Sequence, residues 1–310
     1  MSYRVVLLIY ASEKFVRKPA MNFSKKIYFS CIEMASYPVK FLTRRRDKYI
    51  GESHYGQQHG KGIMSYADGE KYIGEFLNGV RHGRGNYVFG NGDNYIGDYK
   101  SGSRHGHGIY VTNDGSIFAG QFENGFPNGL GTEAFNNGNK YFGDFKLGVP
   151  HGKGVYIWSD GATYSGEFRN GLPDGYGVSI SRSGSKYLGD HRHGRQHGMG
   201  TYTTANGDVY SGEYRNGLRH GEGVEVFADG DRYEGQWADD HFEGMGTYEW
   251  ADGSRYQGEW EAGLFHGLGT MIHADGRKEC GIWRNDNLVQ HYEDNSYAQH
   301  LQVVKQVKTA

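Results

Sequence analysis

The sequence predicts an all-β protein, an elongated single-layer antiparallel β-hairpin solenoid of ten 23-residue repeats and a degenerate eleventh. The first observation is an aromatic residue that recurs every 23 residues without an insertion. The second is glycine, which returns at places 3, 8, 12, 14 and 21 when that aromatic residue is counted as place 1, with the one exception of Asp240 at place 8. The third is that 15% of the residues are aromatic, which suits many small contacts between stacked units. The residues at place 1 are Tyr49, Tyr72, Tyr95, Phe118, Tyr141, Tyr164, Tyr187, Tyr210, Tyr233 and Tyr256.

Each repeat is predicted to form one β-hairpin. Its strands span places 1 to 5 and places 14 to 18, as in 72–76 and 85–89, where aromatic or β-branched residues alternate along the chain. Alternation puts places 1, 3, 5, 14, 16 and 18 on one face, where a tyrosine from the next strand can lie flat over the gap beside a glycine. Asn78-Gly79 predicts the turn within a hairpin, and Asp68-Gly69 predicts the turn between hairpins.

The two ends of the chain differ from the repeats. Residues 1–48 form a predicted N-terminal segment that is rich in lysine and arginine, and the repeat array is expected over 49–287. The tail, 288–310, contains Tyr297, Leu301 and Val304 at helical spacing. We therefore expect a short helix that caps the last hairpin, because the end units of a solenoid have unpaired edges.

Composition excludes several classes of protein. A formal charge of −2 argues against a nucleic-acid partner held by a basic field. Two cysteines fit a reducing compartment, so a cytoplasmic location is expected. No stretch approaches the roughly 20 apolar residues of a membrane-spanning helix.

Two columns of side chains were candidates for chemistry. Histidines recur at place 11, but equivalent places lie two strands, or about 10 Å, apart, so one metal ion cannot bridge two repeats. Carboxylates recur at place 4, yet nearly identical surroundings give no asymmetry that would separate an acid from a base. The sequence therefore predicts no enzyme, no metal and no cofactor. It predicts that the histidines are polar turn residues that stack or hydrogen-bond locally, and that the carboxylates are solvated or hydrogen-bonding ladder residues. The histidines are His59, His82, His105, His151, His197, His220 and His266.

The pattern YxGEFxNGxxHGxGxYxFxDG resembles the MORN repeat, the membrane occupation and recognition nexus motif, from Tyr49 to about Asp286. The resemblance implies a twisted antiparallel meander, a rod on the order of 100 Å long, with aromatic side chains lining a shallow trough. It also implies non-catalytic scaffolding in cytoskeletal or ciliary structures such as radial-spoke heads, membrane tethering, or phosphoinositide binding. The trough residues expected to bind a partner are Tyr72, Phe76, Tyr87, Tyr95, Tyr141, Tyr164, Tyr187, Tyr210, Tyr233 and Tyr256.

Two functions remain open from the sequence. The first is a scaffold for protein–protein interaction in a cytoskeletal, ciliary or flagellar assembly. The alternative is a membrane-surface module in which Arg44, Arg45 and Arg46 contact anionic lipid, although a solvated charge cluster explains the same run.

The last repeats are predicted to pair in a homodimer. Four of the five tryptophans lie there, and tryptophan is typical of interface hot spots. The competing interpretation is a local cap, in which the tail folds over these rings. The residues concerned are Trp237, Trp250, Trp260 and Trp283.

Overall fold

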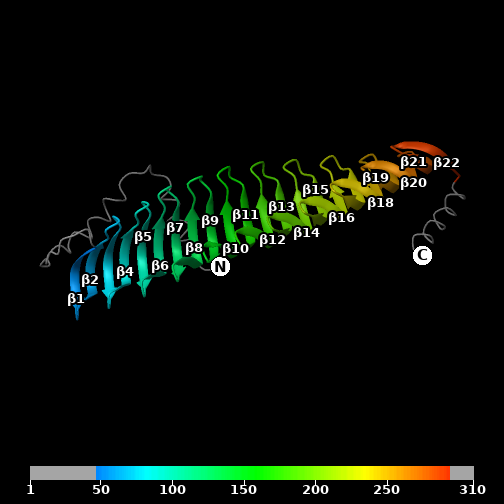
Figure 1. Ribbon diagram of the computed structural model, residues 1–310. Helices are drawn as coiled ribbons and strands as arrows, with labels where there is room; N and C mark the ends of the chain where they lie inside the picture. Colours follow the sequence, from blue (N-terminus) through cyan, green and yellow to red (C-terminus); the bar gives the residue numbers. More distant parts are fainter. Residues whose placement is uncertain (1–46, 294–310) are drawn as a thin grey trace, which may run out of the picture.

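The computed structural model describes residues 47–293 as one elongated, twisted sheet of 22 strands (Figure 1). Each strand pairs antiparallel with the next along the chain, so the sheet is a continuous meander. The strands are β1 Lys48–His54, β2 Gln57–Ser65, β3 Lys71–Leu77, β4 Val80–Val88, β5 Asn94–Lys100, β6 Ser103–Val111, β7 Ile117–Glu123, β8 Phe126–Ala134, β9 Lys140–Lys146, β10 Val149–Ile157, β11 Thr163–Arg169, β12 Leu172–Ile180, β13 Lys186–Arg192, β14 Arg195–Thr203, β15 Val209–Arg215, β16 Leu218–Val226, β17 Arg232–Ala238, β18 His241–Glu249, β19 Arg255–Glu261, β20 Leu264–Ile272, β21 Lys278–Arg284 and β22 Asn287–Tyr292.

This architecture confirms the predicted fold class. The eleventh repeat is also a hairpin, because β21 and β22 pair, and β22 passes the expected end of the array at residue 287. The predicted lipid-contact residues Arg44, Arg45 and Arg46, and the predicted capping helix beyond residue 293, lie outside the described residues.

The second strand of each hairpin begins earlier than predicted. In the second repeat it spans Val80–Val88, whereas the sequence pattern placed its start at Gly85. The register of β3 and β4 shifts between Gly74 and Glu75, so a β-bulge lets pairing continue down to the turn. Gly83, at place 12, has a φ of 60° at this bulge, a conformation that favours glycine. The place-12 glycine therefore belongs to a strand and not to a turn.

Tight turns connect the two strands of each hairpin. Asn78 and Gly79 both have positive φ, at 49° and 85°, which is the geometry of a type I′ turn. The Gly79 amide donates to the carbonyl of Gln58 in the preceding repeat at 2.9 Å. Each turn is thereby tied to its neighbour, as a nearest-neighbour stack requires.

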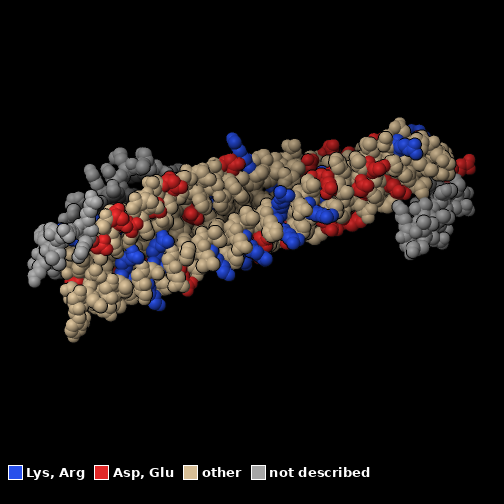
Figure 2. Space-filling view, in the orientation of Figure 1, with Lys and Arg blue, Asp and Glu red and all other residues tan. Residues whose placement is uncertain are grey.

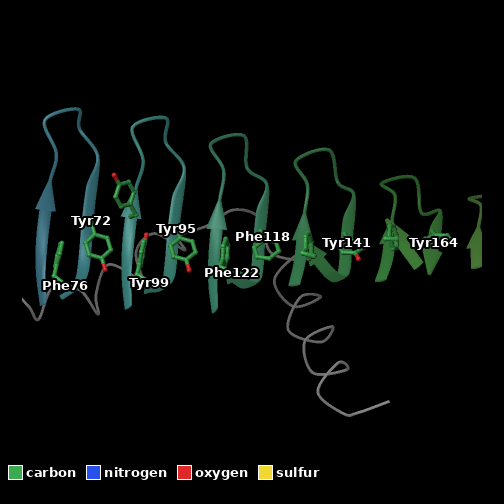
Figure 3. Close-up of a cluster of buried hydrophobic side chains, with 11 residues drawn as sticks. Tyr72, Phe76, Tyr95, Tyr99, Phe118, Phe122, Tyr141 and Tyr164 are labelled. Atoms are coloured by element: carbon green, nitrogen blue, oxygen red, sulfur yellow. The ribbon is translucent and has the colours of Figure 1, made fainter. Parts of the chain in front are cut away.

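The core of the rod is a continuous column of rings on one face (Figure 3). From Tyr72 on, each place-1 ring packs edge-on against the place-5 ring of its own repeat and that of the next; Tyr72 contacts Phe76 and Tyr99 at 5.0 and 5.1 Å. From Tyr49 to Trp283 the centroids are 4.8 to 5.5 Å apart, in the range of favourable aromatic pairs. Stability is therefore shared among many equal contacts.

The strand glycines make room for these rings. A Cβ atom on Gly85 would lie 2.3 Å from the Tyr72 ring, and one on Gly74 would lie 2.5 Å from the Gly85 Cα atom. Place 3 and place 14 accept glycine alone because the tyrosine of the same hairpin lies against both. A ring from the neighbouring strand covers the glycine gap at place 14, as predicted, whereas at place 3 the ring belongs to the same strand, two residues earlier.

Candidate functional site

The rings expected to line an open trough are instead buried in the column. Their exposed fraction is 6% or less, and that of Tyr72, Tyr95, Tyr141, Tyr233 and Tyr256 is 0%. Place-5 rings of the same and of the following repeat cover the place-1 ring, as Phe145 and Phe168 do for Tyr141. The pattern within a single repeat does not show the second of these contacts. These tyrosines hold the sheet together, and a partner in the trough would have to contact the side chains that lie above them.

The C-terminal tryptophans are part of the same column. Trp237, Trp260 and Trp283 are 3 to 5% exposed, and Trp283 Nε1 donates to the carbonyl of Gly269 at 3.0 Å. Trp250 is only half-buried and packs on Tyr248. Homodimerisation through these repeats stays a prediction, and it would have to use surfaces other than the three buried rings.

Place 10 decides how far the trough is covered. This residue lies opposite place 5 in the hairpin, so it stands on the aromatic face. In repeats 2 and 3 it is Arg81 and Arg104, whose guanidinium carbons lie 4.6 and 4.7 Å from the centroids of the Tyr87 and Tyr110 rings.

Large side chains also cover the far end of the trough. In repeats 9 and 10, place 10 is Phe242 and Phe265, which stack flat on the rings of Tyr233 and Tyr256 with centroids 3.8 and 3.9 Å apart. In repeat 8 it is Arg219, whose guanidinium carbon lies 4.2 Å from the centroid of the Trp237 ring. The chain thus fills its own trough in repeats 2 and 3 and in repeats 8 to 10.

At the centre of the trough, in repeats 4 to 7, place 10 has neither an arginine nor an aromatic residue. Pro127, Pro150 and Pro173 recur at the 23-residue period, and Gln196 follows. Within the described residues, none of these four side chains covers a ring of the column in the way that Arg81 and Phe242 do. We name this stretch the central trough.

Two residues at place 16 break the aromatic pattern in the central trough. Tyrosine stands there in half of the repeats, but repeat 4 has Glu133 and repeat 6 has Ser179. Burial raises the pKa of Glu133 to about 7, and no cation of the described residues lies close enough to lower it. An ionisable side chain without a partner therefore faces the open part of the trough.

Ser179 leaves a hollow in the aromatic layer. Two adjoining depressions share Trp158, Ser179 and Gln196, and the one that reaches Tyr202 has a volume of about 390 Å³. Trp158 is 36% exposed and packs on Tyr156 at 4.7 Å, so a large ring forms one wall. The hollow can accept one apolar or aromatic side chain of a partner.

The place-4 carboxylates and amides hold the bulge. Glu75 Oε1 accepts a hydrogen bond from the Arg84 amide at 3.2 Å, and Asp144 Oδ2 accepts one from the Lys153 amide at 2.9 Å. The same bond is formed in seven repeats. These side chains are structural, in agreement with the hydrogen-bonding role that the sequence predicts.

The described residues offer no site for a metal ion, since no three His, Cys, Asp or Glu side chains gather within 47–293. The place-11 histidines stay one per hairpin, on the edge formed by the type I′ turns. Over the same part of the chain, no helix is long and apolar enough to cross a membrane.

The two long edges of the rod differ in charge. Lys and Arg gather toward the edge of the type I′ turns over much of the rod, whereas Asp and Glu gather along the opposite edge (Figure 2). The basic residues near the type I′ turns are Arg81, Lys100, Arg104, Lys146, Arg169, Arg192, Arg195, Arg215 and Arg219.

A single-sheet hairpin solenoid with one covered face defines a class of repeat protein that serves as a scaffold or an interaction module. Ten consecutive segments match the family model for the MORN repeat, and the chain belongs to this family. The matched residues are 49–71, 72–94, 95–117, 118–140, 141–163, 164–186, 187–209, 210–232, 233–255 and 256–276. Comparison with the curated proteins finds no match.

Comparison with solved structures finds distant likenesses. The TCP10 domain of Danio rerio CPAP in complex with a STIL peptide is 12% identical, with 79% of this chain and 99% of that chain covered and a TM-score of 0.31. The SAS-4 TCP domain of Drosophila melanogaster, in complex with a proline-rich motif of Ana2, is 10% identical, covers 58% of this chain and 85% of that chain, and has a TM-score of 0.26. Both TM-scores are too low to carry an argument about fold or function.

Proposed function

We propose that this MORN-repeat protein is a non-catalytic scaffold that binds a protein partner in its central trough, within a cytoskeletal, ciliary or flagellar assembly. The observation that supports it most is the uneven covering of one face. The chain covers its own ring column with Arg81 and Arg104 near one end and with Phe242 and Phe265 near the other, but not between Pro127 and Gln196. The uncovered stretch leaves space above the ring column, so another chain can bind there.

The absence of catalysis is part of the proposal. In seven repeats the place-4 carboxylate or amide accepts a hydrogen bond from a backbone amide, so it holds a bulge and is not aimed at a substrate. The place-1 rings from Tyr72 on are buried. A partner in the trough would therefore be held by van der Waals contacts and ion pairs with the side chains above these rings.

Detergent extraction of ciliated cells that express the tagged full-length chain tests this proposal. We expect the protein to stay with the insoluble cytoskeleton, and we expect Ser179→Tyr, which restores the ring of the repeat pattern, to release it. Ser211→Thr, on the other face of the sheet, is the matched control. Release of the unaltered protein with the soluble or membrane fraction would contradict the scaffold.

A second candidate function, contact with an anionic membrane surface, is supported by the basic edge of the rod (Figure 2). Reversing Lys146, Arg169 and Arg192 to Glu would then abolish co-sedimentation with vesicles that contain anionic lipid. Equal sedimentation of the full-length protein and this variant would exclude the described edge as the lipid contact.

A further inference from the structure

Repeat 8 shows which side chain complements a glutamate at place 16. Glu225 receives two hydrogen bonds from Arg219 Nη1, at 2.8 and 2.7 Å, and the two residues stand at places 16 and 10 of one repeat. The Arg219 guanidinium also lies over the Trp237 ring and donates from Nη2 to the carbonyl of Asp240 at 3.1 Å. A ring below, a carboxylate beside and a carbonyl at the turn together form an arginine site.

Repeat 4 keeps part of this frame without the arginine: it has the place-16 carboxylate, the place-5 ring and a turn residue, but it lacks the Asp240 carboxylate that also accepts from Arg219 Nε at 3.1 Å. Glu133 corresponds to Glu225, Phe145 to Trp237 and Gly148 to Asp240, each 92 residues earlier in the sequence. Place 10, where Arg219 would stand, is Pro127, and the described residues give Glu133 no hydrogen bond or ion pair. A half-buried carboxylate on the aromatic face, opposite Phe118 and Tyr141 in the two neighbouring strands, is therefore left without the cation that its counterpart has.

The hollow at Ser179 lies at a fixed distance from this carboxylate. Ser179 is two repeats, or four strands, beyond Glu133, which corresponds to about 19 Å along the rod. An extended chain covers that distance with about six residues. One short segment laid along the rod can thus reach both places.

We propose that the central trough binds an extended segment of a protein partner, with an arginine paired to Glu133 and an apolar or aromatic side chain, about six residues away, in the hollow between Trp158 and Tyr202. This proposal rests on the scaffold function above, whose binding face it specifies. The arginine would repeat between two chains the contact that Arg219 and Glu225 make within one.

Selection of random twelve-residue peptides displayed on phage against the immobilised full-length protein tests it. We expect enriched peptides to carry arginine about six residues from an aromatic or large apolar residue. Synthetic fluorescent copies should bind Glu133→Gln about tenfold more weakly than the unaltered protein. They should bind Ser179→Tyr at least as weakly, because the new ring fills the hollow.

Pro127→Arg is a second, independent variant, because it places an arginine of the chain itself over Glu133 as in repeat 8. It should also reduce peptide affinity about tenfold, and replacing the arginine of the peptide by citrulline should do the same. Lys153→Gln, on the opposite face of repeat 5, is the matched control and should leave the affinity unchanged. Circular dichroism and thermal melting show that each variant is folded before it is compared.

The outcomes separate this inference from the scaffold proposal. Enriched peptides that lack arginine, or that bind Glu133→Gln and Pro127→Arg as well as the unaltered chain, would overturn the inference and leave the scaffold standing. Failure to enrich any peptide would overturn both the inference and the trough as the binding face. It would indicate that a second copy or the chain's own basic residues 1–46 occupy the central trough.

Discussion

The ring column predicts that the same substitution has unequal effects at two glycines. Gly154→Ala and Gly62→Ala each add a methyl group next to a tyrosine, with the new Cβ 2.3 Å from Tyr141 Oη in one and 2.4 Å from Tyr49 Oη in the other. Ordinary contact needs about 3.4 Å or more, so either ring must shift by about 1 Å. The local clash is thus matched, and only the surroundings of the two rings differ.

The cost at Gly154 follows from what Tyr141 would lose. Its ring packs edge-on against Phe145 and Phe168, both at 5.0 Å, and its hydroxyl donates to the Asp144 carbonyl at 2.9 Å. Two aromatic pairs at about 1 kcal/mol each and one hydrogen bond at about 1 kcal/mol give roughly 3 kcal/mol. A shift of the ring out of its buried site would also expose apolar area, so 3 to 4 kcal/mol is our rough expectation.

The cost at Gly62 is smaller because Tyr49 is less constrained. Its ring contacts Phe76 at 5.2 Å, but its own repeat has Ser53 at place 5 in place of a second ring. Tyr49 is partly exposed and can move outward. Its hydroxyl also donates to the Glu52 carbonyl at 2.6 Å, but this bond is exposed to water, so its loss costs less than that of the Tyr141 bond. We expect a loss of about 1 to 2 kcal/mol from one aromatic pair and this exposed hydrogen bond.

Hydrogen exchange measured by mass spectrometry is the assay, because a long repeat array need not unfold in one step. Gly154→Ala should remove protection from β9, β10 and β11 and from the strands on either side, whereas Gly62→Ala should affect β1 to β3 alone. Equal losses of protection around the two sites would refute the reasoning from the ring column.

The sequence predicts the repeat, the hairpins, both kinds of turn and the face that carries the rings, because each depends on periodicity alone. The sequence did not predict where the second strand begins, because glycine at place 12 is equally typical of a turn and of a β-bulge. The hydrogen bond from the Arg84 amide to Glu75 explains why place 4 is always a carboxylate or an amide up to Glu259. That regularity was visible, but its meaning depends on a register shift that only coordinates give.

Burial of the place-1 rings could not be derived from one repeat. The exposed area of Tyr141 depends on Phe168 of the following repeat, and thus on the tilt of one ring against the next. The central trough, in contrast, was readable in the sequence. Pro127, Pro150 and Pro173 recur at the repeat period, and Glu133 interrupts a column of mainly aromatic residues. The central trough becomes visible when the residues at one place, such as place 10 or place 16, are compared across all repeats.

Three further predictions concern single places in the array. Leu147, at place 7, has a φ of 51°, a conformation that Asn adopts more easily than Leu. Leu147→Asn should therefore raise the free energy of unfolding, measured in urea, by about 1 kcal/mol. An unchanged unfolding midpoint would contradict strain at this turn. Burial raises the pKa of Glu133 to about 7 from an ordinary 4.5, so the native state binds the proton more tightly. Stability should therefore fall as the pH rises from about 4.5 to 7 and level off above it; Glu133→Tyr should remove this part of the pH dependence of the melting temperature, and identical pH profiles would argue against it. His191 is the only place-5 ring from Phe76 to Trp283 that can gain a proton near neutral pH, and it packs between Tyr164 and Tyr187 at 4.8 and 5.0 Å. Burial lowers its pKa below the ordinary 6.5, so the unfolded chain takes up the proton first and stability is lost as the pH falls through 6.5 toward the lowered value. His191→Phe restores the ring of the neighbouring repeats and should keep the hydrogen-exchange protection of β13 at pH 5 as high as at pH 8; an equal loss of protection at pH 5 in both proteins would show that His191 is not the acid-sensitive point of the column.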